Sequence, residues 1–156
     1  MKLAEALAER ADAVRRVSQL RARIVGSARY QEGETPPENA AELLAEAERV
    51  LDELEALIRR INATNAATRL DDGTTVTDAL ARRDVLRLRH SILTAAADAA
   101  AGADQRGVAR QLRSELRMLS ALPVAELRGQ ADRLARDIRT VDTRIQRANW
   151  EVDLID

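Results

Sequence analysis

The residues best suited to chemistry lie at one end of a hydrophobic helical pattern. Apolar residues repeat in steps of four and three along the row Leu43, Ala47, Val50, Leu54, Leu57 and Ile61. A neighbouring row contains Leu44, Leu51 and Ile58. The first row turns polar at Thr64 and Thr68, and Asn65 stands where the second row needs another aliphatic residue. Polar groups on a buried face cost free energy unless they find partners, so this end predicts either a satisfied network or a binding site.

Eight residues form the candidate ligand-binding set. In an antiparallel bundle, the end of the second helix, the start of the third and the end of the fourth share one pole. The candidates at this pole are Asn62, Asn65, Thr68, Arg82, Arg83, Asp84, Asn149 and Trp150. We assign no catalytic role to any of them. The alternative interpretation is a structural network that sets helix register, as buried asparagine does in coiled coils.

Composition and spacing exclude several other kinds of site. The chain has no cysteine and one histidine, His90, with Arg87 rather than a glutamate three residues before it. Thiol nucleophiles, cysteine-based zinc sites and paired Glu-x-x-His di-metal sites are therefore excluded. The sequence contains no glycine-rich phosphate loop; the pair Asp72 and Gly73 indicates only a turn. We expect neither a metal nor a cofactor.

Charge gives little support for a nucleic-acid or membrane partner. The net charge is −1, and no aromatic residues alternate with the arginines that are dense from Arg106 to Arg147. Those arginines form a basic face for an acidic partner, pair with the acids between Glu32 and Glu55, or lie on solvated faces. Charged residues interrupt the first segment, and no stretch is apolar enough to span a membrane. We therefore expect a soluble, cytoplasmic protein that binds no nucleic acid.

Four stretches have the composition and periodicity of long helices. Alanine, leucine, arginine and glutamate dominate the chain, which favours helices. The first two helices are expected at about residues 2–26 and 38–69, and a Thr75–Asp78 capping box opens the third. The third uses the apolar row Ala81, Val85, Leu88, Ile92, Ala95 and Ala99. The fourth carries a seam from Leu127 that ends with Ala148, Val152 and Ile155.

Four seams of similar length predict an all-α, antiparallel four-helix bundle that forms one domain over residues 1–156. A short β or extended element is expected at one pole, because residues 106–123 are ambiguous. The leucines of this segment fit a helix, whereas its last residues alternate as in a strand.

Trp150 and leftover apolar residues predict self-association. Trp150 is out of phase with the fourth seam, while Val25, Leu86 and Leu93 lie off the main rows of their helices. Helical bundles bury such residues by symmetric association. We expect a homo-oligomer with Trp150 at or near the interface; packing of Trp150 on the first helix is the alternative.

Several motifs give the chain a family resemblance. The segments MKLAEALAERAD, ARYQEGETPPENAAELL, INATNAATRL, TDALARRDVLRLRHSIL and IQRANWEVDLID resemble the septicolysin-like small bacterial proteins. The resemblance implies a helical protein of undetermined function with an extended segment at residues 114–122, and it places INATN, RRD and NW among the hallmark motifs. The family label suggests a cytolysin. One tryptophan and no cysteine argue against this, because thiol-activated cytolysins are larger, β-rich proteins with a tryptophan-rich loop.

The leading functional interpretation is a non-enzymatic, self-associating structural or interaction protein. One alternative is a small-ligand-binding protein or enzyme that uses the pole around Asn65, Arg82 and Asp84, with an unknown ligand. The other alternative is the cytolysin that the family label implies.

Overall fold

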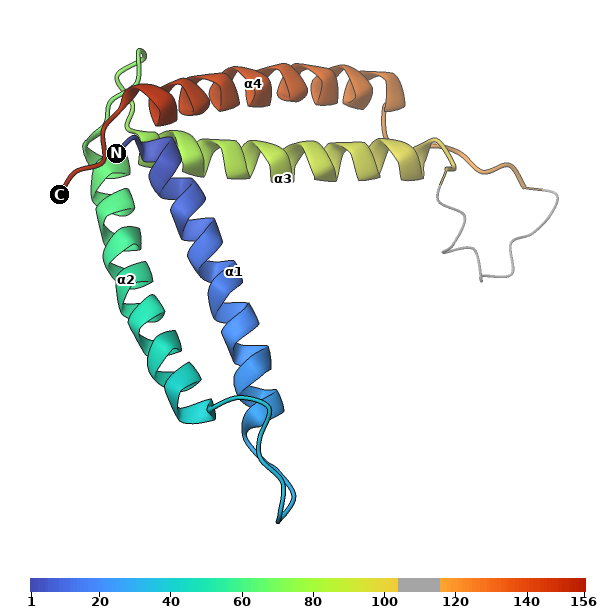
Figure 1. Cartoon of the computed structure of the whole chain (residues 1–156). Helices are drawn as coiled ribbons and strands as arrows, with labels where there is room; N and C mark the ends of the chain where they lie inside the picture. The colour runs from blue at the N-terminus through green and yellow to red at the C-terminus, as the bar shows by residue number, and fades with distance from the viewer. Residues whose placement is uncertain (104–115) are drawn as a thin grey trace. The chain divides into compact units, whose positions relative to one another are not determined.

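The computed structural model describes residues 1–103 and 116–156. Within these residues the chain forms four α-helices and no β-sheet, so the predicted all-α class with four long helices is confirmed. The helices are α1 (Leu3–Ser27), α2 (Ala40–Ala67), α3 (Val76–Ala100) and α4 (Val124–Glu151). Figure 1 shows two antiparallel helix pairs, α1 with α2 and α3 with α4, a packing consistent with a helical bundle.

The chain divides into two compact units. The first unit comprises Met1–Thr77 and Arg147–Asp156, and the second comprises Asp78–Gln146. Most of α4 therefore belongs to the second unit, while its last turn and the C-terminal tail belong to the first. A single domain over residues 1–156 stays a prediction.

Asparagine capping and apolar packing define the α1–α2 pair. The side chain of Asn39, two residues after Pro37, accepts hydrogen bonds from the backbone amides of Ala41 and Glu42, so α2 begins near the expected place. One buried cluster contains Leu20, Leu43, Ala47 and Val50. Three of its members, Leu43, Ala47 and Val50, belong to the apolar row predicted for the second helix, and they pack against Leu20 of α1.

The two ends of the chain complete a second cluster in the first unit. Leu3, Ala6, Ile61 and Leu154 are buried together. The Leu3 amide donates to the carbonyl of Val152, and the Leu154 amide donates to the carbonyl of Met1. These bonds hold the C-terminal tail beside the start of α1.

The seam predicted for the fourth helix is wrong at its last two positions. The helix ends at Glu151, so Val152 and Ile155 lie in the tail rather than on a helical face. Leu154 is 8% exposed, whereas Ile155 is 43% exposed. The tail adopts a locally bridged conformation against Lys2, and this backbone pairing replaces helical spacing with alternation.

Ion pairs join α3 to α4 in the second unit. The guanidinium groups of Arg83 and Arg87 lie 3.0 and 3.1 Å from the two carboxylate oxygens of Asp142. Arg128 reaches Asp98 at 2.6 Å, near the other end of the pair. These contacts identify the side of α3 that faces α4.

The apolar row assigned to the third helix points away from the buried side, contrary to expectation. Val85, Leu88 and Ile92 are exposed, while Leu86 is buried and Leu93 is half-buried. The helix has two apolar rows, and spacing alone does not say which one packs inward. The paired arginines beside Leu86 select the inward side, because their partner Asp142 lies on α4.

Other sequence expectations have mixed outcomes. Leu54 and Ile138, at the middle of their seams, are half-buried rather than fully buried. Residues 116–123 form neither a helix nor a paired strand, and the rest of the ambiguous segment lies outside the described residues. The Asp72–Gly73 turn is confirmed: Gly73 has φ +82°, and the Thr74 amide donates to the Asp72 carboxylate at 3.0 Å. In the described ranges, no helix is both long and apolar enough to cross a membrane.

Candidate functional site

Thr64 is the buried polar residue at the end of the α2 row. Its side chain is fully buried, and its hydroxyl donates to the carbonyl of Arg60 at 2.8 Å. The same oxygen accepts a hydrogen bond from the amide of Ile155 at 3.0 Å. Thr64 therefore connects α2 to the C-terminal tail, as the structural-network interpretation predicts for a buried hydroxyl.

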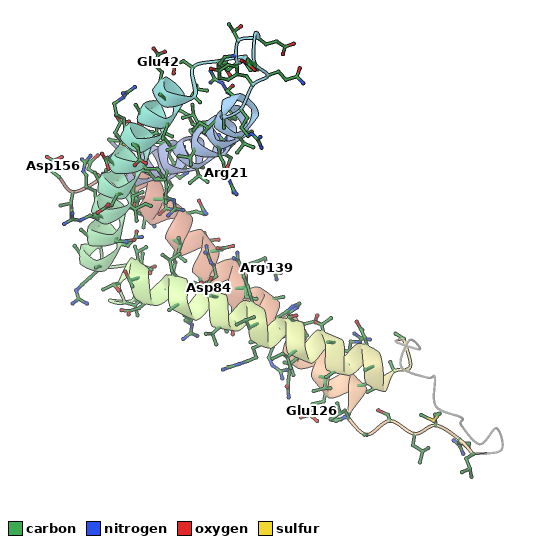
Figure 2. The ribbon with its side chains drawn as sticks, turned by 90° about the horizontal axis from the view of Figure 1, so that it is seen from below. Arg21, Glu42, Asp84, Glu126, Arg139 and Asp156 are labelled. Atoms are coloured by element: carbon green, nitrogen blue, oxygen red, sulfur yellow. The ribbon has the colours of Figure 1, made fainter. Side chains whose placement is uncertain are left out.

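Arg60 extends this connection along the tail. Its Nε donates to the carbonyl of Ile155 at 3.0 Å, and its Nη2 donates to the Asp156 carboxylate at 2.8 Å. Figure 2 labels Asp156 at the tip of the tail, beside α2. Together, Arg60 and Thr64 satisfy both backbone groups of Ile155, so this part of the polar end holds the fold together.

Five of the eight candidate site residues lie in the first unit. Asn62 is exposed, Asn65 and Thr68 are half-buried, and Asn149 is only 7% exposed. Trp150 is 65% exposed, which does not fit the alternative of a tryptophan packed on the first helix. Thr68 has a clear structural role, because its amide donates to the carbonyl of Thr64 at the end of α2 and its carbonyl accepts from Val76.

Arg82, Arg83 and Asp84 lie at the start of α3, in the second unit. The side chain of Arg83 is 20% exposed and is held by Asp142. Among the described residues its buried Nε has no hydrogen-bond partner, and it lies 3.7 Å from the carboxylate of Asp84. Arg82 and Asp84 are exposed, so neither is positioned by a surrounding pocket. Their assignment to a ligand site stays a prediction.

An open groove of about 840 Å³ between α1 and α2 is lined by charged side chains. Arg16 pairs with Glu46, while Arg23 binds both carboxylate oxygens of Glu38. The hydrogen bonds from these arginines lower the pKa of Glu46 and the pKa of Glu38. Because the opposite charges already neutralise one another, the groove offers no concentrated charge for a ligand. Glu38 and Glu46 therefore pair with arginines of α1, rather than with the arginines between Arg106 and Arg147 that were considered as partners from the sequence.

The exposed apolar row of α3 is the least expected surface feature. We call it the α3 stripe and define it as Ala81, Val85, Leu88, Ile92, Ala95 and Ala99, all of them exposed. The three large side chains, Val85, Leu88 and Ile92, are 52%, 65% and 68% exposed. The spacing of this row was recognised in the sequence, but the row was predicted to lie in the core rather than on the surface. The same residues would have suggested an interface if Leu86 had first been placed inside.

Comparisons with known proteins identify the family but no activity. A model of a family of unknown function (DUF6847) matches residues 10–154. A solved structure of a functionally unknown conserved protein from Corynebacterium diphtheriae is similar, with 38% sequence identity, a TM-score of 0.90 and 99% of each chain covered. No curated protein matches the chain significantly.

These findings correct the septicolysin-like assignment made from short motifs. Neither the family model nor the solved structure refers to septicolysin, so the cytolysin alternative loses its basis. Segments such as INATNAATRL are only about ten residues long, and matches of this length do not specify a family. The family model extends over nearly the whole sequence, and the chain belongs to this family of unknown function.

Proposed function

We propose that this protein is a non-enzymatic helical interaction protein that self-associates through the α3 stripe. The observation that carries the proposal is the exposure of Val85, Leu88 and Ile92 on one face of a helix whose other side already packs. Large apolar side chains that are grouped on one face mark association sites more often than scattered ones do.

The spacing of the stripe supports a helical partner. Its members follow one another in steps of four, three, four, three and four residues, the heptad spacing of a coiled-coil seam. From residue 81 to residue 99 the stripe extends over about 27 Å at 1.5 Å per residue. The seam therefore offers a narrow, regular surface that suits another helix better than a small molecule.

The helix that carries the stripe is already folded before association, so association does not have to supply the free energy of helix nucleation. A free helix of this length is marginal in water because nucleation is unfavourable. The ion pairs to α4 hold α3 in place through Asp142 and Asp98. With three large and three small residues in the seam, we expect a weak dimer with a dissociation constant on the order of 10 μM.

Sedimentation of the wild-type chain between 1 and 300 μM tests the proposal. We expect the weight-average mass to rise toward that of a dimer, and Leu88→Glu to weaken association at least tenfold because it places a charge in the seam. Val14→Glu is the matched control, since Val14 is also an exposed large apolar residue, at 49%, but lies on α1. A wild-type chain that stays monomeric at 300 μM would refute self-association.

Trp150 and the cellular location belong to the same proposal. Because Trp150 is the sole tryptophan of the chain, its emission reports on its own surroundings. The sequence predicts Trp150 at or near the interface, so we expect its emission to shift to the blue as the protein concentration rises.

We also propose that the protein acts in the cytoplasm, which fractionation of cells that produce it would test.

A further inference from the structure

We infer that the α3 stripe pairs with the α3 stripe of a second copy in parallel and in register, an inference that rests on the self-association proposed above. Three features of the stripe and its borders support it: the residue types within the seam, the charges beside it, and the side of α3 that α4 occupies.

The residue types in the seam match those of two-stranded parallel coiled coils. In heptad notation, Val85, Ile92 and Ala99 occupy position a, while Ala81, Leu88 and Ala95 occupy position d. β-Branched residues at a with leucine at d favour two parallel strands. The alanines toward the ends of the seam let the helices approach closely, but add little buried area.

The charges beside the seam favour the same orientation. Asp84 occupies position g, and Arg89 occupies position e of the next heptad, five residues further along. In a parallel, in-register pair, position g of one helix faces that e position of the other. Two symmetric ion pairs, Asp84 with Arg89 of the second copy, would therefore form. Both side chains are exposed, and within the described residues 1–103 and 116–156 Asp84 makes a loose ion pair alone, the 3.7 Å contact with Arg83.

An antiparallel pair would place like charges together. When two helices run in opposite directions, position e faces e and position g faces g. Arg89 would then meet Arg89 of the second copy across the centre of the stripe, and Asp84 would face Asp98, which is already paired with Arg128. Like charges at such positions destabilise a helix pair, so the borders of the stripe disfavour this arrangement.

The α4 helix leaves the stripe free for this contact. Arg83 and Arg87, which hold Asp142 of α4, lie roughly 160–200° around the helix axis from Val85, at 100° per residue. A second α3 helix could therefore pack against Val85 without displacing α4.

Disulfide trapping tests the orientation separately from association. The chain has no cysteine, so Ala95→Cys introduces a single thiol at a d position and keeps all three large seam residues. Under mild oxidation at 100 μM, we expect most of the chain to become a covalent dimer, because a parallel in-register pair brings the two thiols together. Thr140→Cys, on the exposed surface of α4, is the control and should form little covalent dimer.

Charge exchange provides a second, independent test. We expect Arg89→Glu to raise the dissociation constant about five- to tenfold, since two attractive pairs become repulsive. The double change Asp84→Arg with Arg89→Glu should restore it to within about twofold. Arg82→Glu is the matched control: it also reverses an e-position charge on α3, but the g position that would face it, Thr77, carries no charge.

The outcomes separate the two proposals. A dimer by sedimentation that neither forms the Ala95→Cys disulfide nor recovers on charge exchange would overturn the parallel arrangement while leaving self-association intact. A wild-type chain that remains monomeric would overturn both. Covalent dimer in the Ala95→Cys variant, together with recovery of affinity in the exchanged variant, is the result expected.

Discussion

The two units of this protein use their large apolar side chains differently. In the first unit, Leu3, Leu20 and Ile61 are at most 1% exposed and pack in two clusters between α1, α2 and the C-terminal tail. In the second unit, α3 buries Leu86 and Ala97 on one side but exposes the large side chains of Val85, Leu88 and Ile92 on the other. Buried area gives fold stability, whereas exposed apolar area remains available for association. The difference therefore assigns stability and self-association to separate residues.

Core truncation should give the largest effect and the clearest contrast between the units. Ile61→Ala removes a side chain that is 1% exposed, and we expect it to lower the free energy of unfolding by about 2–5 kcal/mol. Leu88→Ala, on the exposed stripe, should change it by less than about 0.5 kcal/mol when measured at a dilution that keeps the chain monomeric. Urea unfolding followed by circular dichroism measures both. Equal losses would remove the distinction between the units.

The α3–α4 ion pairs should contribute the next largest effect. Asp142→Ala leaves the largely buried guanidinium of Arg83 without its carboxylate, and we expect a loss of about 1–3 kcal/mol. The matched control is Asp137→Ala, which removes an exposed carboxylate from the same helix and should have little effect. Thermal unfolding of the two variants compares them. If both behave alike, Asp142 does not hold the helices together.

The attachment of the C-terminal tail should be sensitive to one hydroxyl. Thr64→Val keeps the shape of the side chain but removes the acceptor for the Ile155 amide, so we expect a loss of about 1 kcal/mol. Hydrogen exchange at Ile155 should accelerate more than exchange in the middle of α2. Thr140→Val serves as control, because the hydroxyl of Thr140 donates to the Arg136 carbonyl of its own helix rather than holding the tail. Unchanged exchange at Ile155 would show that the tail is held by other contacts.

Acid should weaken the α1–α2 pair by a smaller amount. Arg23 and Arg16 lower the pKa of Glu38 and the pKa of Glu46 below the ordinary value of 4.5. A carboxyl group whose pKa is lower in the folded state stabilises the fold at pH values above its ordinary pKa. This stabilisation disappears as the pH falls through the folded-state pKa. Acidification from pH 7 to pH 3 should therefore lower the melting temperature.

A variant isolates the glutamate contribution to this acid sensitivity. Changing both Glu38 and Glu46 to glutamine should reduce the acid-induced decrease in melting temperature by about 1 °C, because exposed pairs contribute little. Differential scanning calorimetry at the two pH values measures this difference. An identical decrease in both proteins would assign the acid sensitivity to other carboxylates.

The periodic and local features were predictable from the sequence. Four helices, the start of α2 after Pro36 and Pro37, and the tight turn at Gly73 all follow from local preferences that act within a few residues. The polar end of the α2 row was also visible, and Thr64 is indeed buried and hydrogen-bonded. The sequence did not reveal which residue would bond to the Thr64 hydroxyl, because that residue, Ile155, lies 91 positions away.

What only the tertiary structure decided is the direction in which each apolar row points. Helical spacing defines both rows of α3 equally well, and it carries no information about which row meets α4. The choice depends on Asp142, 59 positions from Arg83, whose two arginine contacts orient the helix. Likewise, Leu154 rather than Ile155 is buried because the tail pairs with the N-terminal backbone instead of continuing α4. Local spacing determines the helices of this protein, whereas long-range contacts determine which residues remain on its surface.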